Sequence, residues 1–339
     1  MLAAYLNQFG GPEVLEVGNL RAPGVADDEV RVAVRSSALN HLDIWVRKGL
    51  AGLKVEFPHI LGGDASGLVE AVGKNVTDLF IGDEVIVHPG LSKAPWEEVE
   101  SLAADYRILG EHVNGTNAEM VTVPRENIFP KPKNLSFDEA ASVPLVFTTA
   151  WQMLVGRAKV KAGDLVLVHA AASGVSSAAI QIAKCFGATV VATAGNAEKL
   201  ELAAKLGADL VVNYSNQEAA SEIKNKFGKR RVDMIIDHVG ADTWKSHFEV
   251  LRRGGKIVTC GATSGYLVPL DLRHVFYKQI QILGSTMGSK GDFPRILRLL
   301  EDGKLRPVVD RSFALRDIQE AHRHLEGRDA LGKVVVRVS

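Results

Sequence analysis

VLVHAAASGVSSAAIQIAK, residues 166–184, contains in order an apolar strand, a turn of small residues and a helix. In this arrangement a dinucleotide pyrophosphate meets the free N–H groups and the partial positive charge of a helix N-terminus. The three glycine positions of the GxGxxG pattern fall on Ala171, Ser173 and Ser176, and only Gly174 stands nearby. Because the glycines are so few, an ordinary strand-to-helix turn is the alternative interpretation of this segment taken alone.

The sequence around this segment repeats the same rhythm of apolar strand and amphipathic helix. Strand-like runs occur at Leu165–His169, Thr189–Thr193, Leu210–Asn213, Met234–Asp237, Lys256–Cys260 and Gln281–Gly284. Six strands with intervening helices predict a doubly wound parallel sheet, the Rossmann arrangement of an α/β protein. The regular alternation of six strands with helices therefore favours a dinucleotide-binding site at residues 166–184 over an ordinary strand-to-helix turn.

The first ~145 residues have a different pattern, in which short β-branched runs alternate with Gly, Pro and Asp turns. Such runs are Val30–Val34, Ser66–Val72, Asp83–Val87 and Met120–Val123. Beyond residue 288 the sequence predicts helices at Phe293–Glu301 and Asp317–Glu326 and a last strand at Lys333–Val338. We therefore predict a β-rich domain over 1–146, a Rossmann domain over 147–288, and a segment over 289–339 that returns to the first domain.

The composition is that of an ordinary globular protein with two domains. The chain has 339 residues, more than the roughly 250–300 at which a single core stops growing. Forty basic and forty acidic side chains give no net charge and no indication of a nucleic-acid partner. No apolar run is long enough for a membrane span, and residues 1–10 do not resemble a secretory signal. We expect a cytoplasmic protein that acts on a small molecule.

The end of the second Rossmann strand indicates which dinucleotide binds. NAD-binding versions of this fold carry an acidic residue there, which binds the ribose 2′-hydroxyl and repels a 2′-phosphate. This sequence has Thr193, Ala194, Gly195 and Asn196 at that place, and Lys199 follows within one helical turn. The sequence therefore favours NADP(H) over NAD(H).

Specific landmarks along nearly the whole chain resemble the medium-chain dehydrogenase/reductase superfamily. They are Phe9–Val14, Ala38–Asp43, Gly62–Gly67, Val69–Gly73, Gly82–Val85, Val143–Trp151 and Gly332–Lys333. This resemblance implies that the β-rich part is a GroES-like catalytic domain and that the active site lies between it and the Rossmann domain. Quinone reductases of this superfamily hold the 2′-phosphate with a lysine and a tyrosine that match Lys199 and Tyr214. The other implied cofactor contacts are Thr148, Ser173, Gly174, Val175, Gly195, His238, Cys260, Gly261 and Lys333.

The resemblance also shows which positions hold catalytic zinc in the alcohol dehydrogenases of the superfamily. The matching residues here are Asn40, Gly63 and Asp64, which lack the thiolate and imidazole ligands that zinc prefers. The positions of the proton-relay hydroxyl and histidine are Leu42 and Trp45. A lobe that carries four cysteines in zinc-type relatives has matching borders here at His88–Ser92 and Tyr106–His112, but no cysteine lies between them. We therefore expect no metal.

Without zinc, a quinone or an α,β-unsaturated carbonyl is the substrate class that the sequence favours, because its electron-poor carbon accepts hydride directly. The candidate catalytic residues are Asn40, His41, Asp43, Trp45 and Asp64. Asn40 or His41 is the candidate oxyanion donor, and solvent or His41 is the candidate proton source. For Asp43 and Asp64, hydrogen bonding that only holds the loops is an equal alternative.

Two other functions stay open at this stage. One is an alcohol or aldehyde dehydrogenase of the zinc-type branch that has lost its metals, and the other is a non-enzymatic NADPH-binding protein. The sequence does not identify the substrate, the direction of the reaction or the proton donor. By resemblance we expect a homodimer or homotetramer that pairs through residues 279–286.

Overall fold

The computed structural model describes residues 1–93, 100–229 and 231–338. The chain divides into two compact units. Unit 1 comprises residues 1–145, 289–303 and 307–339, and unit 2 comprises residues 146–288 and 304–306. Each unit has its own sheet and its own core, and each is described by itself below.

Unit 2 contains a six-stranded parallel sheet with the strand order β13-β12-β11-β14-β15-β16. Its strands are β11 (Leu165–Val168), β12 (Thr189–Ala194), β13 (Leu210–Asn213), β14 (Val232–Asp237), β15 (Leu251–Thr259) and β16 (Gln281–Gly284). The chain starts in the middle at β11, runs to one edge, and returns to place β14 on the other side of β11. The predicted doubly wound parallel sheet of six strands is confirmed.

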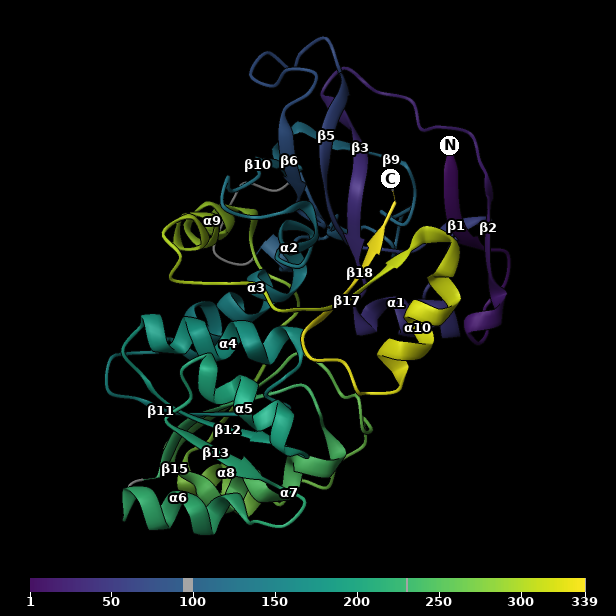
Figure 1. Ribbon diagram of the computed structural model, residues 1–339. Coiled ribbons are helices and arrows are strands. Elements are labelled where there is room, and N and C mark those ends of the chain that lie inside the picture. The colour runs from purple at the N-terminus through teal and green to yellow at the C-terminus, as the bar shows by residue number, and fades with distance from the viewer. Residues whose placement is uncertain (94–99, 230, 339) are drawn as a thin grey trace. The chain divides into compact units, whose positions relative to one another are not determined.

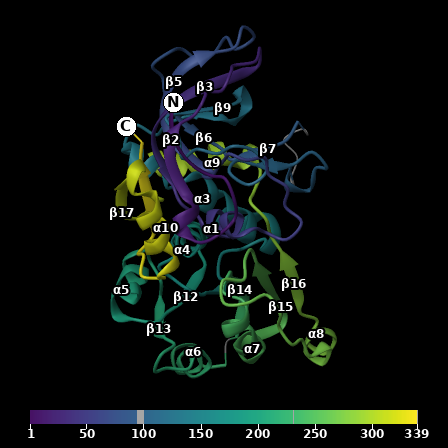
Figure 2. The same cartoon turned by 90° about the vertical axis from the view of Figure 1, so that its right-hand side faces the viewer.

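The helices of unit 2 follow the strands in alternation, as Figures 1 and 2 show in teal and green. They are α4 (Gly174–Cys185), α5 (Ala197–Lys205), α6 (Ala219–Phe227), α7 (Ala241–Val250) and α8 (Leu272–Lys278). α3 (Pro144–Trp151) continues into the π-helical segment η4 (Gln152–Ala158). All four residues of β11 are buried, as expected of a central strand with helices on both faces of its sheet. The site in unit 2 is therefore built on rigid elements.

Unit 1 is the β-rich part that the sequence predicts. Its seven-stranded sheet has the order β10-β6-β5-β3-β18-β17, with β9 also paired to β3, and smaller sheets have the orders β2-β1-β4 and β7-β8. The strands are β1 (Leu2–Leu6), β2 (Leu15–Asn19), β3 (Glu29–Ala38), β4 (His59–Ile60), β5 (Asp64–Val72), β6 (Glu84–Val87), β7 (Gly90–Leu91), β8 (Arg107–Ile108), β9 (Met120–Pro124), β10 (Ile128–Pro130), β17 (Val309–Ala314) and β18 (Lys333–Arg337). Its helices are α1 (His41–Lys48), α2 (Phe137–Ala141), α9 (Phe293–Glu301) and α10 (Ile318–Glu326).

The longest strand of unit 1 shows why this part forms a sheet. Along β3 the side chains of Val30, Val32 and Val34 are buried in one core cluster, and the residues between them are only partly buried. This period of two is the pattern of a strand with one face on the core. β18 pairs antiparallel with the end of β3, so the last strand of the chain is central to the sheet rather than at its edge.

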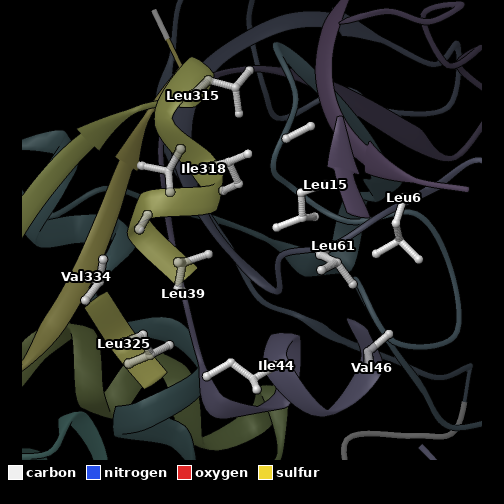
Figure 3. Close-up of a cluster of buried hydrophobic side chains, with 13 residues drawn as sticks. Leu6, Leu15, Leu39, Ile44, Val46, Leu61, Leu315, Ile318, Leu325 and Val334 are labelled. Atoms are coloured by element: carbon white, nitrogen blue, oxygen red, sulfur yellow. The ribbon is translucent and has the colours of Figure 1, made fainter. Parts of the chain in front are cut away.

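A second core cluster of unit 1 joins α1 and α10 to β18 (Figure 3). In Figure 3, Ile318 and Leu325 project from α10 toward this core, and Ile44 and Val46 come from α1. Both helices therefore pack on the same apolar core as Leu39, which follows β3. This packing fixes the start of α1, where the candidates Asn40, His41 and Asp43 lie.

A buried arginine adds polar contacts between the same two helices. The guanidinium of Arg47, on α1, donates to the backbone oxygen of Gly10 and to Nδ1 of His322, and it pairs with Glu326 at 2.9 Å. Arg47 is fully buried, so these acceptors replace the water that its charge loses.

None of the helices in the described ranges has the length and apolar character that a membrane crossing needs.

Candidate active site

Asn40 and Asp43 form the N-terminal cap of α1. The backbone N–H of Asn40 donates to Oδ2 of Asp43 at 2.7 Å, and the N–H of Gly62 donates to Oδ1 at 2.9 Å. Burial raises the pKa of the Asp43 carboxyl to about 6, while the Asn40 N–H bond and the charge of Lys333 oppose this rise. Asp43 therefore ties the start of α1 to the loop before β5.

Lys333, the first residue of β18, directs its ammonium group into this buried region. Its Nζ donates to the Leu39 backbone oxygen at 2.8 Å, to Asn40 Oδ1 at 2.5 Å and to Asp64 Oδ2 at 2.9 Å. An ammonium group has three N–H donors, so all of them have acceptors. The Lys333 side chain is only 4% exposed, and Asp64 is not exposed at all. Lys333 and Asp64 thus form a buried ion pair, and Lys333 makes further hydrogen bonds to Leu39 and Asn40.

Asp64 and Asn40 are held on every side. Oδ1 of Asp64 accepts from the backbone N–H of Leu145 at 2.7 Å, and Oδ2 accepts from Asn40 Nδ2 at 2.9 Å as well as from Lys333. The second N–H of Asn40 Nδ2 lies 3.4 Å from the Ala38 oxygen. Three residues that the sequence indicates, Asn40, Asp64 and Lys333, therefore form one hydrogen-bonded cluster, which we call the Lys333 cluster.

The Lys333 cluster contains two of the three positions at which zinc-type relatives place their metal. At the third, a Cβ built on Gly63 would lie 3.5 Å from Leu145 Cδ1, beside an apolar side chain. Within residues 1–93, 100–229 and 231–338, no three His, Cys, Asp or Glu side chains are grouped so as to hold a metal ion. The cation that Asn40 and Asp64 bind in this structure is the ammonium group of Lys333.

Another buried lysine lies near the predicted cysteine-free lobe. Nζ of Lys290 pairs with Glu100 at 2.6 Å and with Glu126 at 3.2 Å, and both Lys290 and Glu100 are fully buried. The Lys290 backbone N–H also donates to Glu100 at 2.7 Å. Residues 94–99 of this lobe lie outside the described residues. The ion pair links the described end of the lobe to the segment before α9.

The two remaining catalytic candidates lie on α1. His41 and Trp45 are four residues apart, so they share one face of the helix, and both are half-buried. Their partial exposure distinguishes them from Asn40, Asp43 and Asp64, which are buried.

In unit 2, the turn between β11 and α4 brings hydrogen-bond donors together. Ser173 is the N-cap residue of α4, and its Oγ accepts from the backbone N–H of Ser176 at 3.2 Å. The backbone N–H groups of Gly174 and Val175 have no acceptor among the described residues. Ala170 enters the turn with φ +48°, a left-handed conformation that glycine adopts more readily. The turn therefore keeps the anion-binding property of a helix N-terminus with only one glycine in its core.

The predicted 2′-phosphate residues follow two neighbouring strands: Lys199 is on α5, after β12, and Tyr214 follows β13. Oδ1 of Asn196 accepts from the backbone N–H of Lys199 at 3.0 Å, which starts α5. A Cβ built on Gly195 would lie 2.8 Å from the hydroxyl oxygen of Tyr214, so the tyrosine side chain lies against Gly195. Ser215 donates to the Gly195 oxygen at 2.9 Å. Gly195 and Tyr214 are thus in contact, and Tyr214 is 63% exposed.

The remaining predicted cofactor contacts lie at other strand ends and on α3. His238 follows β14, and its Nε2 contacts the hydroxyl groups of Ser173 and Ser176. Cys260 follows β15, next to Gly261, and burial raises the pKa of its thiol to about 12. Thr148 is buried on α3, and its Oγ1 has no hydrogen-bond partner among the described residues.

Sequence reasoning did not assign roles to Leu145, Ser176 or Ser215. Leu145 acts through its backbone N–H, which leaves no signal in the side-chain pattern. Ser176 occupies the third glycine position of the dinucleotide pattern. A serine in place of that glycine could have indicated a polar role from the sequence alone.

Comparisons with known proteins agree with these two units. Residues 26–133 match the family model described as the alcohol dehydrogenase GroES-like domain, and residues 174–302 match the model described as zinc-binding dehydrogenase. A quinone oxidoreductase of Pseudomonas aeruginosa is 30% identical, over 97% of this chain and 97% of its own length.

Solved structures are similar along the whole chain. An NAD-dependent alcohol dehydrogenase has 50% sequence identity and a TM-score of 0.97, with 100% of both chains covered. A 2-octenoyl-CoA carboxylase reductase in complex with NADP and 2-octenoyl-CoA has 30% identity and a TM-score of 0.89, covering 99% of this chain and 87% of its own. The similar proteins thus include quinone, alcohol and enoyl-CoA oxidoreductases.

Proposed function

The chain belongs to the medium-chain dehydrogenase/reductase superfamily and is an oxidoreductase, and from this premise we propose that it transfers hydride from NADPH to a quinone or an α,β-unsaturated carbonyl without zinc. The observation that carries the proposal is the Lys333 cluster. Oδ1 of Asn40 and Oδ2 of Asp64 both accept from the ammonium group of Lys333. A metal ion at this place would have to displace a buried, fully bonded cation.

The residues of unit 2 fit a phosphorylated dinucleotide. The N–H groups of Gly174 and Val175 and the hydroxyl of Ser173 are donors suited to the pyrophosphate. Lys199, in the first turn of α5, and Tyr214, in contact with Gly195, are the residues that would bind a ribose 2′-phosphate. The bound dinucleotide would supply the hydride, and these residues would hold it in place.

The chemistry needs a donor for the oxygen of the substrate, because negative charge develops there as the carbon accepts hydride. Both N–H groups of Asn40 Nδ2 already face protein acceptors, Asp64 and Ala38. His41, half-buried in the first turn of α1, is therefore the proposed hydrogen-bond or proton donor. Trp45 on the same face would contribute apolar contact with the substrate.

One finding favours a second candidate, an alcohol or aldehyde dehydrogenase that works without metal. The solved structure with 50% identity to this chain is titled an NAD-dependent alcohol dehydrogenase. This candidate predicts reduction of the oxidised dinucleotide by an alcohol in the presence of a chelator. The non-enzymatic alternative is set aside, because the similar proteins are enzymes.

The test of the proposed function is oxidation of NADPH, followed by its absorbance, with a panel of quinones and 2-alkenals, with chelator and with added zinc. We expect turnover that the chelator leaves unchanged. Lys199→Ala should raise the KM for NADPH about tenfold or more, since hydrogen bonds to charged groups contribute roughly 1.5–3 kcal/mol, and should leave the KM for NADH unchanged. The matched control is Lys205→Ala on the same helix, where the lysine is exposed and pairs with Glu201. Activity that depends on zinc, or that appears with alcohols alone, would overturn the proposal.

We also propose that the protein is a homodimer or homotetramer that pairs through β16. This strand is an edge of the sheet, and Ile282 on it is 36% exposed. Phe276 and Tyr277 at the end of α8 are 69% and 67% exposed, which adds apolar surface near the same edge.

Light scattering after size-exclusion chromatography tests the assembly. The wild-type mass should be two or four times 36.5 kDa, and Ile282→Lys should lower it, because two like charges would meet across the two-fold axis. Phe80→Lys, at an exposed apolar side chain of unit 1, is the control and should keep the wild-type mass. A monomeric wild type, or an unchanged mass for Ile282→Lys, would contradict pairing through β16.

A further inference from the structure

Three polar side chains meet behind the turn at the N-terminus of α4. Nε2 of His238 lies 2.8 Å from Oγ of Ser173 and 3.1 Å from Oγ of Ser176. Ser173 is the N-cap of α4, Ser176 is in its first turn, and His238 follows the end of β14. All three residues belong to unit 2. The imidazole ring of His238 thus contacts the turn that is proposed to bind the cofactor.

The positions of the protons follow from the acceptors. Oγ of Ser176 lies 2.6 Å from the backbone oxygen of His169, and a carbonyl only accepts, so the hydroxyl proton of Ser176 is used there. The 3.1 Å contact between Ser176 and His238 then contains a proton only if Nε2 of His238 carries it. This geometry assigns the Nε2–H form to His238, which donates to both serines.

The Nε2–H form of His238 determines which hydrogen bonds the Ser173 hydroxyl can make. Its Oγ accepts from the backbone N–H of Ser176 and from Nε2 of His238, so both of its acceptor positions are filled. The hydroxyl group has one role left, which is to donate. Among the described residues no acceptor remains for that proton, and the N–H groups of Gly174 and Val175 are the neighbouring donors.

We infer that His238 is a positioning residue for the cofactor, which fixes the Ser173 hydroxyl as a donor to the dinucleotide pyrophosphate. The inference rests on the proposed function, because it assumes that a dinucleotide binds at this turn. A serine hydroxyl that rotates freely presents either a proton or a lone pair to an anion. A hydroxyl whose lone pairs are already occupied presents only the proton, which is what a phosphate oxygen needs.

Three further observations agree with this role. Burial lowers the pKa of the His238 imidazole, which favours the neutral ring that donates from one nitrogen. The backbone of His238 is itself fixed, since its oxygen accepts from the N–H of Thr263 at 3.1 Å. The carboxylate of the preceding Asp237 accepts hydrogen bonds from the backbone N–H groups of Val239 and Gly240. Hydrogen bonds of the surrounding backbone therefore fix the position of the His238 side chain.

The role also explains a departure of the turn from the glycine pattern. Where GxGxxG proteins bring the backbone close to the pyrophosphate, this chain has serine at the second and third glycine positions. These two serines are the ones that His238 contacts. A side-chain donor oriented by a histidine would replace the close backbone approach that the missing glycines provide.

The experiment measures the Kd of NADPH, NADH and 2′-AMP by fluorescence or calorimetric titration. Ser173→Ala and His238→Phe should each weaken both dinucleotides about tenfold, because both contain the pyrophosphate. Neither variant should change the Kd of 2′-AMP, which lacks the pyrophosphate, by more than about twofold. His238→Gln keeps a donor at this place and should restore binding to within about threefold of the wild type.

The double variant tests whether the two residues act together. If His238 acts through Ser173, then Ser173→Ala with His238→Phe should weaken NADPH no more than Ser173→Ala alone. The control is Ser177→Ala on the same helix, where the hydroxyl donates to the Gly174 oxygen, and it should bind both dinucleotides normally.

The outcomes separate the inference from the proposed function. If the wild type binds neither NADPH nor NADH, both fail. If the wild type binds a dinucleotide and the two substitutions weaken it additively, or if His238→Phe leaves the Kd unchanged, His238 does not act through Ser173 and the inference is overturned. A loss of 2′-AMP binding in His238→Phe would likewise overturn it, since the substitution would then disturb the whole site.

Discussion

Lys333→Met is expected to lower the free energy of unfolding by about 3–5 kcal/mol, because it leaves Asp64 as a buried charge without its cation. The methionine side chain also has no donors for the Leu39 oxygen and for Oδ1 of Asn40, both of which Lys333 satisfies now. The measurement is urea unfolding followed by circular dichroism at neutral pH. Because Asn40 caps α1, which carries His41, we expect kcat to fall as well as stability.

A double variant distinguishes loss of the charge pair from loss of packing. Asp64→Asn, combined with Lys333→Met, removes the unpaired charge, and the amide of Asn40 is then free to turn its oxygen toward the N–H groups of the introduced side chain. Replacing both partners of a buried ion pair is often close to neutral, so this variant should recover most of the lost stability. Lys74→Met is the control, since Lys74 is 73% exposed in its pair with Asp27 and should change stability by less than about 0.5 kcal/mol. Equal losses for the single and the double variant would contradict the charge-pair explanation.

The Lys333 cluster shows how far the sequence predicts a site. Asn40 and Asp64 stand out because they occupy positions where a metal ligand is expected, and Lys333 stands out because of the Gly332–Lys333 landmark. Their meeting is not visible in the sequence, since Lys333 is 293 positions from Asn40 and 269 from Asp64. It depends on the pairing of β18 with the end of β3, a contact between opposite ends of the chain. Local patterns carry no information about such a pairing.

The Rossmann part is more predictable because its signals are local. Each strand there contains a short apolar or β-branched run, and a helix comes between each strand and the next. The parallel direction therefore follows from the alternation, whereas the order of the strands in the sheet does not. The boundaries are less well predicted. β15 begins at Leu251, before the expected Lys256, because Leu251 already pairs with Val232 of β14. The pairing resumes at Lys256, after an irregular stretch in which Gly254 has φ +67°. The orientation of His238 toward Ser173 was also beyond prediction, since it joins the ends of two strands that are neighbours only in the folded sheet.

The second large effect is a loss of stability in mild acid. Four of the buried histidines, two in each unit, have a pKa that burial lowers to about 4 or less. They are His88 and His169 with a pKa of about 3, His322 with about 3, and His247 with about 4, against 6.5 for an exposed histidine. A group whose pKa is lower in the folded state contributes stability above about pH 6.5, and that stability is lost as the pH falls toward the folded value. The pKa of Asp43, raised to about 6, acts in the opposite direction and offsets about one proton.

For these four histidines and Asp43 together, the net uptake on unfolding near pH 5 is about three protons, which corresponds to about 4 kcal/mol per pH unit. We expect the free energy of unfolding to fall by about 6 kcal/mol between pH 7 and pH 5, a large part of the roughly 5–15 kcal/mol that a typical protein has. Urea unfolding at half-unit steps of pH measures this slope.

Single substitutions show which buried histidine contributes to the pH dependence of the free energy of unfolding. His322 accepts a hydrogen bond from Arg47, so its protonation places a second cation beside a buried guanidinium. His322→Gln keeps an acceptor for Arg47 and cannot take up a proton, so it should reduce the loss between pH 7 and pH 5 by about 2 kcal/mol. His112→Gln, at an exposed histidine, should leave the slope unchanged. A free energy of unfolding that stays constant over this range of pH would mean that the four rings accept protons in the folded protein, and it would refute their assignment as neutral buried groups.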